Sequence, residues 1–245
     1  MKYIIALSII LLASISYPVY SQDEAQIITY GETVQGKFPV GAEEVEFTFS
    51  GLAGDIVVIE SKSMDILNGF MPEIQILNAR GTAIADTTEN FDIESLDFIQ
   101  VMIPLEIPAD GDYTIIIKNG SYFELDEDAD FELRLLQPEI LANNTPIQGT
   151  ASTEEKAFYV VISNEDFSID FSKVSGDMLV SVSIGRIESG GLETLAVLYG
   201  EMTQGNIQIT PNRNTLHLIT IQEAPYEITI FGVKTADFEL TLNQG

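Results

Sequence analysis

The chain lacks cysteine and tryptophan and has one histidine, His217, among its 245 residues. Without cysteine it can form no disulfide, Cys-ligated zinc site or thiol nucleophile. A single histidine rules out a histidine-rich metal site, and any Ser-His-Asp triad would have to use it. No Gly-x-Ser-x-Gly sequence is present, and His217 lies in the strand-like sequence NTLHLITI. We therefore expect His217 to be a structural or surface residue rather than a catalytic one.

Basic residues are scarce as well. The chain has 11 Lys and Arg against 38 Asp and Glu, a formal net charge of −27. Nucleic acids and anionic membranes both require a positive protein face, so neither is an expected partner. The excess charge suits a soluble exported protein, or one that recruits cations.

Long apolar runs are absent except at the start, where residues 4–15 follow Lys2. This run is shorter than the roughly 20 residues of a membrane-spanning helix. Val19 and Ser21 are small enough for a cleavage site, which predicts a signal peptide over residues 1–21 and a mature start at Gln22. We expect a secreted or periplasmic protein with no membrane insertion of the mature chain; an uncleaved N-terminal anchor is the alternative.

The rest of the chain shows no long helical periodicity. Instead, Val45, Phe47 and Phe49 alternate with polar residues, a period of two that is typical of a strand with one buried face. Gly, Pro, Asn and Asp separate the apolar runs. In the first half we expect strands near residues 33–38, 44–50, 55–61, 72–78, 98–105, 112–119 and 130–136.

Four short sequence segments, here called phrases, each occur in two similar versions, and the two sets follow the same order along the chain. The paired phrases are SGLAGDIVVIES and SKVSGDMLVSVS, VQGK and IQGT, DGDYTIII and EAPYEITI, and ADFELRL and ADFELTL, with offsets of 122, 113, 113 and 107 residues. Two units are thus expected, residues 22–138 and 139–245, joined through residues 137–146. In the first phrase pair, Gly54 and Gly176 are expected to need a positive φ or a very close approach of neighbouring atoms. Seven or eight short strands per unit predict an all-β chain of two tandem antiparallel β-sandwiches of jelly-roll type.

The first unit resembles a known family. Its strand-Gly-Asp-strand, followed by PEIQILNARGTAIA, IPADGDYTIIIKN and ADFELRL, looks like the bacterial pre-peptidase C-terminal domain from about residue 28 to 137. The second unit is a divergent copy, because LETLAVLYGEMTQGNIQI lacks a clear Asn/Asp-x-x-Gly turn. The resemblance implies a jelly-roll accessory module of secreted bacterial proteins, whose relatives bind extracellular polymers, some with calcium. Within these 245 residues we expect no peptidase domain beside the two copies, so the peptidase-linked role does not carry over directly.

Acidic residues concentrate in the first unit. Residues 22–138 hold 24 acids and five bases, against 14 and five in residues 139–245. One cluster includes Asp86, Glu89, Asp92, Glu94 and Asp97. The other, ELDEDAD, includes Glu124, Asp126, Glu127, Asp128 and Asp130. Calcium prefers six to eight oxygen ligands. We expect a weak calcium site at Asp126, Asp128 and Asp130, with a solvated acidic loop as the alternative.

No motif defines a reaction centre or any other cofactor site. Tyr113 and Tyr226, which match in the repeated phrases, are expected to hold fixed positions in the core or at a corner. The sequence favours a secreted, non-catalytic protein that binds an extracellular protein or polysaccharide, or that supports a secreted enzyme. A hydrolase with an unrecognised carboxylate pair and a purely structural envelope component are the alternatives. The oligomeric state is left open.

Overall fold

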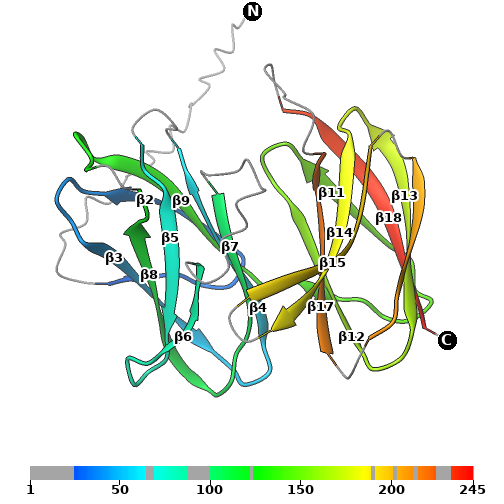
Figure 1. Cartoon of the computed structure of the whole chain (residues 1–245), viewed down its shortest axis with the longest axis horizontal. Helices are drawn as coiled ribbons and strands as arrows, with labels where there is room; N and C mark the ends of the chain where they lie inside the picture. The colour runs from blue at the N-terminus through cyan, green and yellow to red at the C-terminus, as the bar shows by residue number, and fades with distance from the viewer. Residues whose placement is uncertain are drawn as a thin grey trace, which may run out of the picture.

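A computed structural model describes residues 25–64, 69–87, 100–121, 124–188, 191–200, 203–211, 215–224 and 233–244. These residues form strands and turns with no helix, which confirms the all-β class (Figure 1). Within them, a helix of the length and apolarity needed to cross a membrane does not occur. The predicted signal peptide lies outside the described residues.

Nine strands build the described part of the first half. They are β1 (Gln26–Ile27), β2 (Glu32–Phe38), β3 (Glu44–Gly51), β4 (Ile56–Ser63), β5 (Pro72–Leu77), β6 (Ala83–Asp86), β7 (Gln100–Glu106), β8 (Gly111–Asn119) and β9 (Ala129–Leu136). One sheet has the order β1-β3-β8-β5-β6 and the other β2-β9-β4-β7. Apart from the short parallel pair β1–β3, all pairs are antiparallel. Strands β2 to β9 thus form an eight-stranded jelly roll, as predicted.

The second half repeats this arrangement. Its strands are β10 (Glu139–Ile140), β11 (Ile147–Ser152), β12 (Ala157–Ser163), β13 (Phe167–Gly176), β14 (Val180–Glu188), β15 (Gly191–Gly200), β16 (Gln204–Ile209), β17 (Thr215–Glu223) and β18 (Thr235–Gln244). The sheet orders β10-β12-β17-β14-β15 and β11-β18-β13-β16 are those of the first half with nine added to every strand number. Each strand of the first jelly roll therefore has an equivalent in the second.

This equivalence confirms two of the four phrase pairs. VQGK and IQGT lie in the equivalent strands β2 and β11, and the two ADFEL phrases lie in β9 and β18. Gly36 of β2 faces Phe131 of β9, and Gly149 of β11 faces Phe238 of β18. A Cβ at either glycine would overlap the facing aromatic ring, so each edge strand leaves room for a core ring at the same place.

The other two phrase pairs were matched wrongly. The Ser50–Ser61 phrase crosses the turn between β3 and β4, whereas the Ser172–Ser183 phrase crosses the turn between β13 and β14. They are similar turns at successive places in the fold, because β3 corresponds to β12 and not to β13. Tyr226 lies beyond the end of β17 and outside the described residues. Tyr113 of β8 faces inward and lies opposite Phe49 of β3. The equivalent inward residue of β17 is His217, which lies opposite Val161 of β12.

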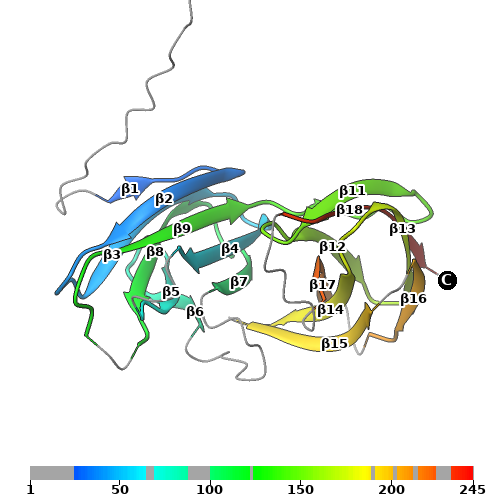
Figure 2. The same ribbon diagram turned by 90° about the horizontal axis from the view of Figure 1, so that it is seen from above.

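Each jelly roll encloses its own apolar core, and a third cluster joins them. Ile56 and Val58 of β4 pack with Phe158 and Val160 of β12 and with Leu218 of β17, all five buried. Outward-facing residues of β4 thus meet outward-facing residues of β12 and β17, and Figure 2 shows the two jelly rolls side by side. We call this contact the junction. It gives the two halves a common buried surface in addition to the covalent link.

Candidate functional site

The predicted calcium residues lie in a loop and strand start at one end of the first jelly roll. We call residues 124–130, which comprise the loop before β9 and the first two residues of that strand, the acidic loop. Asp130 forms an ion pair with Lys37 of the neighbouring strand β2, with Nζ 2.8 Å from Oδ1. Asp128 accepts a hydrogen bond from the backbone N–H of Val40, at 3.0 Å. The structure thus uses two of the three predicted ligands to tie the loop to β2 and the turn that follows it.

The acidic surroundings act on Lys37. Its hydrogen bond with Asp130 raises the pKa of the ammonium group, and the charges of Asp128 and Glu127 act in the same direction. Over the described residues, no three His, Asp or Glu side chains are grouped so that they could hold a metal ion. Calcium binding at Asp126, Asp128 and Asp130 therefore stays a prediction, and it would require the loop side chains to rearrange.

A hollow of about 460 Å³ lies beside the acidic loop. Its lining combines apolar side chains with an amide, a hydroxyl group and two carboxylates. The lining residues are Phe38, Val40, Gly41, Ala42, Glu43, Asn119, Ser121, Glu124 and Leu125. Glu43 and Glu124 are both exposed. The hollow is open to solvent, of the size of a small binding site, and could accommodate an apolar group that carries a hydrogen-bond donor or a positive charge.

The other acidic cluster is described only at its start. Glu89, Asp92, Glu94 and Asp97 lie outside the described residues. Asp86, at the end of β6, accepts a hydrogen bond from the side-chain amide of Gln75 at 3.0 Å. Asp86 therefore takes part in a cross-strand contact of the sheet.

The single histidine is sealed in the core of the second jelly roll. His217 has an exposed fraction of 0%, and its ring meets Phe167 edge-on at a centroid distance of 5.0 Å. Its Nε2 lies 3.2 Å from Oγ1 of Thr215. Burial lowers the pKa of the imidazole, and the positive charge of Arg186 adds to that effect. His217 is therefore held neutral and away from any substrate in solution, as expected of a structural residue.

Tyr113 also has a structural place. It stacks on Phe49, with ring centroids 5.4 Å apart, and its hydroxyl donates a 2.6 Å hydrogen bond to the carbonyl of Ala109, four residues earlier. This contact fixes the chain where it enters β8, so the predicted corner role of Tyr113 is confirmed.

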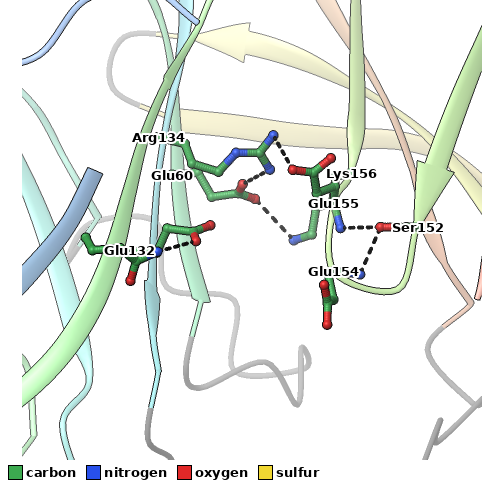
Figure 3. Close-up of polar contacts among 8 residues, drawn as sticks. Glu60, Glu132, Arg134, Ser152, Glu154, Glu155 and Lys156 are labelled. Carbon is green, nitrogen blue, oxygen red and sulfur yellow. Dashed lines mark hydrogen bonds and ion pairs between the residues drawn. The ribbon is translucent and has the colours of Figure 1, made fainter. Parts of the chain in front are cut away.

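The junction contains a set of four charged residues that the sequence interpretation missed, of which only Glu155 is exposed (Figure 3). Glu60 of β4 has an exposed fraction of 2% and accepts a 3.2 Å hydrogen bond from Nη1 of Arg134 in β9. Across the junction, Lys156 lies 3.9 Å from Glu60, and Glu155 lies 3.9 Å from Arg134. The four side chains therefore form one row of contacts in which positive and negative charges alternate, in the order Lys156, Glu60, Arg134 and Glu155.

One signal for these charges was present in the sequence. Glu60 interrupts the apolar run IVVIES, and a buried strand tolerates a carboxylate only if it is paired. The partners could not be identified from sequence, because Lys156 follows a turn in the other half of the chain. Ser152 shapes that turn by accepting hydrogen bonds from the N–H groups of Glu154 and Glu155.

No family profile and no curated protein matches the chain. Similar solved structures include the pre-peptidase C-terminal domain of a Bacillus anthracis collagenase, at 14% identity and TM-score 0.35, over 47% of this chain and 98% of that one. A tandem CBM22 pair of Paenibacillus barcinonensis Xyn10C matches at 12% identity and TM-score 0.25, over 87% of each chain. Clostridium perfringens ZmpB, with a catalytic domain and two CBM51 domains, matches at 8% identity and TM-score 0.26, over 82% of this chain and 34% of that one. These scores are too low to carry an argument about function.

Proposed function

We propose that the chain is an exported, non-catalytic binding protein made of two tandem copies of a pre-peptidase C-terminal-like jelly roll, the second of them divergent. It engages an extracellular protein or polysaccharide, or supports a secreted enzyme made separately. The observation that carries the proposal is the hollow beside the acidic loop, which is open to solvent and lined by apolar and polar residues together, including the exposed Glu43 and Glu124. The histidine that a triad would need is sealed in the other jelly roll.

The lining of the hollow indicates what it would accept. Leu125 and Val40 offer apolar contact, while Glu43 and Glu124 accept hydrogen bonds or attract a positive charge. Proteins supply such groups through Lys, Arg and Tyr, and polysaccharides supply them through hydroxyl groups on apolar ring faces. Both partner classes named by the proposal are compatible with this chemistry.

A binding experiment tests the proposal. The mature chain, starting at Gln22, is immobilised and exposed to the secreted fraction of its host and to insoluble polysaccharides, with and without calcium. We expect one component to be retained, and the double variant Glu43→Gln/Glu124→Gln to retain it at least about tenfold less tightly. The matched control is Glu165→Gln/Asp166→Asn, which removes two exposed acids from the second jelly roll.

Three results would contradict parts of the proposal. Equal retention by both double variants would place binding elsewhere than the hollow. Turnover of a peptide or glycan library by the mature chain, without a retained partner, would favour the hydrolase alternative. Recovery of the chain in the cytoplasm with residues 1–21 still attached, shown by N-terminal sequencing, would contradict export.

A further inference from the structure

The hollow beside the acidic loop lies where acids far outnumber bases. Its lining residues fall within three segments, residues 37–44, 118–121 and 124–130. Together these segments contain seven acids and two bases. A charged group that enters the hollow therefore meets a negative potential, which a concave surface with apolar walls strengthens.

Both bases of these segments are already paired. Lys37 lies 2.8 Å from Asp130. Lys118 lies 4.0 Å from Glu44 and donates a 3.2 Å hydrogen bond to the side-chain oxygen of Gln75. Five carboxylates of the three segments form no ion pair in the described part of the chain. They are those of Glu43, Glu124, Asp126, Glu127 and Asp128.

Apolar side chains reach the same hollow. Val40 has an exposed fraction of 49%, and the half-buried Leu125 packs against the core of the first jelly roll. Asp128 joins the two walls, because it accepts the hydrogen bond from the backbone N–H of Val40. A group that suits this place has an apolar stem and a positively charged end. Lysine and arginine side chains combine the two.

The lining suits a sugar less well. Sugar rings pack their apolar faces on exposed aromatic rings, which offer a large rigid surface. Phe38, the one aromatic side chain among the described lining residues, is only 2% exposed and presents no such surface. Neutral sugars also leave the unpaired carboxylates uncompensated, and acidic polysaccharides are repelled by them. Charge complementarity therefore favours a basic protein segment.

We propose that the hollow binds a lysine or arginine side chain from an exposed basic segment of an extracellular protein. The stem lies on Val40 and Leu125, and the charged end pairs with Glu43 and Glu124. This inference rests on the proposed function, because it names the partner class of the same site. The other unpaired acids attract further basic residues of the segment, and this attraction weakens as the salt concentration rises.

Fluorescence anisotropy of labelled hexalysine, titrated with the mature chain, tests the inference. Hexalysine should bind, whereas hexalysine acetylated on its side chains keeps its stems, loses their charges and should not bind. Glu43→Gln/Glu124→Gln should raise the dissociation constant about tenfold or more. The charge-matched control, Glu165→Gln/Asp166→Asn in the second jelly roll, should raise it less than about twofold, because only distant attraction is lost.

A second pair of variants tests the apolar contact. Val40→Ser keeps the backbone hydrogen bond to Asp128 and should raise the dissociation constant about threefold or more, because the stem loses apolar contact. Val174→Ser, the same change at an exposed valine of β13, should leave the dissociation constant unchanged. Circular dichroism establishes that each variant remains folded.

Four results would overturn the inference. The first is a failure of hexalysine to bind, and the second is equal weakening by the two double variants, which would indicate general attraction to an acidic surface. The third is equal binding by Val40→Ser and Val174→Ser. The fourth is a glucosamine hexamer that binds more tightly than hexalysine and depends on Glu43 and Glu124, since the hollow would then take an amino polysaccharide.

The proposed function can outlive this inference. If hexalysine does not bind but a component of the secreted fraction is still retained through Glu43 and Glu124, only the basic partner is rejected. If retention of that component does not depend on these two residues, the hollow itself is rejected as the binding site, and both proposals fail there.

Discussion

Two glycines that precede an aspartate face different constraints. Gly54 and Gly176 both adopt a positive φ, 86° and 95°, which confirms the sequence prediction. A Cβ at Gly54 would meet no atom within 4 Å, whereas a Cβ at Gly176 would overlap the carbonyl oxygen of Thr235. The first position thus needs glycine for its backbone conformation alone, and the second needs it for space as well.

Alanine substitutions should separate these two costs. Gly54→Ala should lower the free energy of unfolding by about 1 kcal/mol, the usual cost of a left-handed alanine. Gly176→Ala should cost more, about 2 kcal/mol or above, because the Thr235 strand must also move. Urea unfolding of the full mature chain measures both, and equal costs would show that the contact with Thr235 relaxes freely.

The buried histidine predicts a pH dependence. Because the pKa of His217 is lowered in the folded state, the unfolded chain binds its proton first as the pH falls. Its contribution to stability is therefore complete above the ordinary histidine pKa of about 6.5 and is lost as the pH falls through the folded value. The loss cannot exceed about 1.4 kcal/mol per pH unit for one proton.

A variant without the histidine provides the comparison. His217→Leu should flatten the fall of the free energy of unfolding between about pH 7 and pH 5, because an aliphatic side chain takes up no proton. The many surface carboxylates titrate in both proteins, so the difference between the two curves isolates His217. Parallel curves would show that the imidazole accepts a proton within the folded core.

At the level of elements, the strands were predictable and their pairing was not. All seven strands expected in the first half are present within a few residues of their predicted ends, because alternation and turn residues are local signals. β6 was missed since AIAD is too short to show a period. The phrase around Gly54 was matched to that around Gly176 because similar strand-turn-strand sequences arise at successive places of one fold.

The acidic loop shows the same limit at a candidate site. Its charge was evident from sequence, but its contacts with Lys37 and Val40 depend on β9 lying beside β2. The hollow likewise draws residues from the β2–β3 turn, the end of β8 and the acidic loop. Sequence patterns identify such residues singly and do not bring them together.

Calcium should reveal whether the loop can rearrange into a metal site. At a calcium concentration ten times the dissociation constant, binding would stabilise the fold by about 1.4 kcal/mol, a rise of a few degrees in Tm. Sodium at matched ionic strength controls for screening. Asp126→Asn/Asp128→Asn should abolish the calcium-specific part of the shift. Equal shifts with both salts would leave the acidic loop as a solvated surface.

At the level of the whole molecule, the junction couples the two jelly rolls. Removing Glu60 would leave Arg134 and Lys156 beside an apolar contact without their shared carboxylate. Glu60→Ala should lower the free energy of unfolding by about 3 kcal/mol, as expected when a buried pair is broken. The wild-type chain should melt in one calorimetric transition, and the variant in two.

An exposed pair provides the control for this experiment. Glu44 of β3 lies 4.0 Å from Lys118, and the exposed fractions of the two side chains are 41% and 38%. Glu44→Ala should cost less than about 1 kcal/mol and keep the single transition. Two transitions in the wild-type chain would show that the jelly rolls unfold independently in spite of the junction.

The junction also has a consequence for avidity. With β4 packed on β12 and β17, the hollow of the first jelly roll and the surface of the second are held at a fixed spacing and angle. A ligand long enough to touch both would make its second contact at a high effective concentration. The loss of chain entropy that accompanies loop closure by a flexible linker would not weaken this second contact. A ligand with the wrong spacing would gain nothing, so the chain would discriminate among partners by length as well as by chemistry.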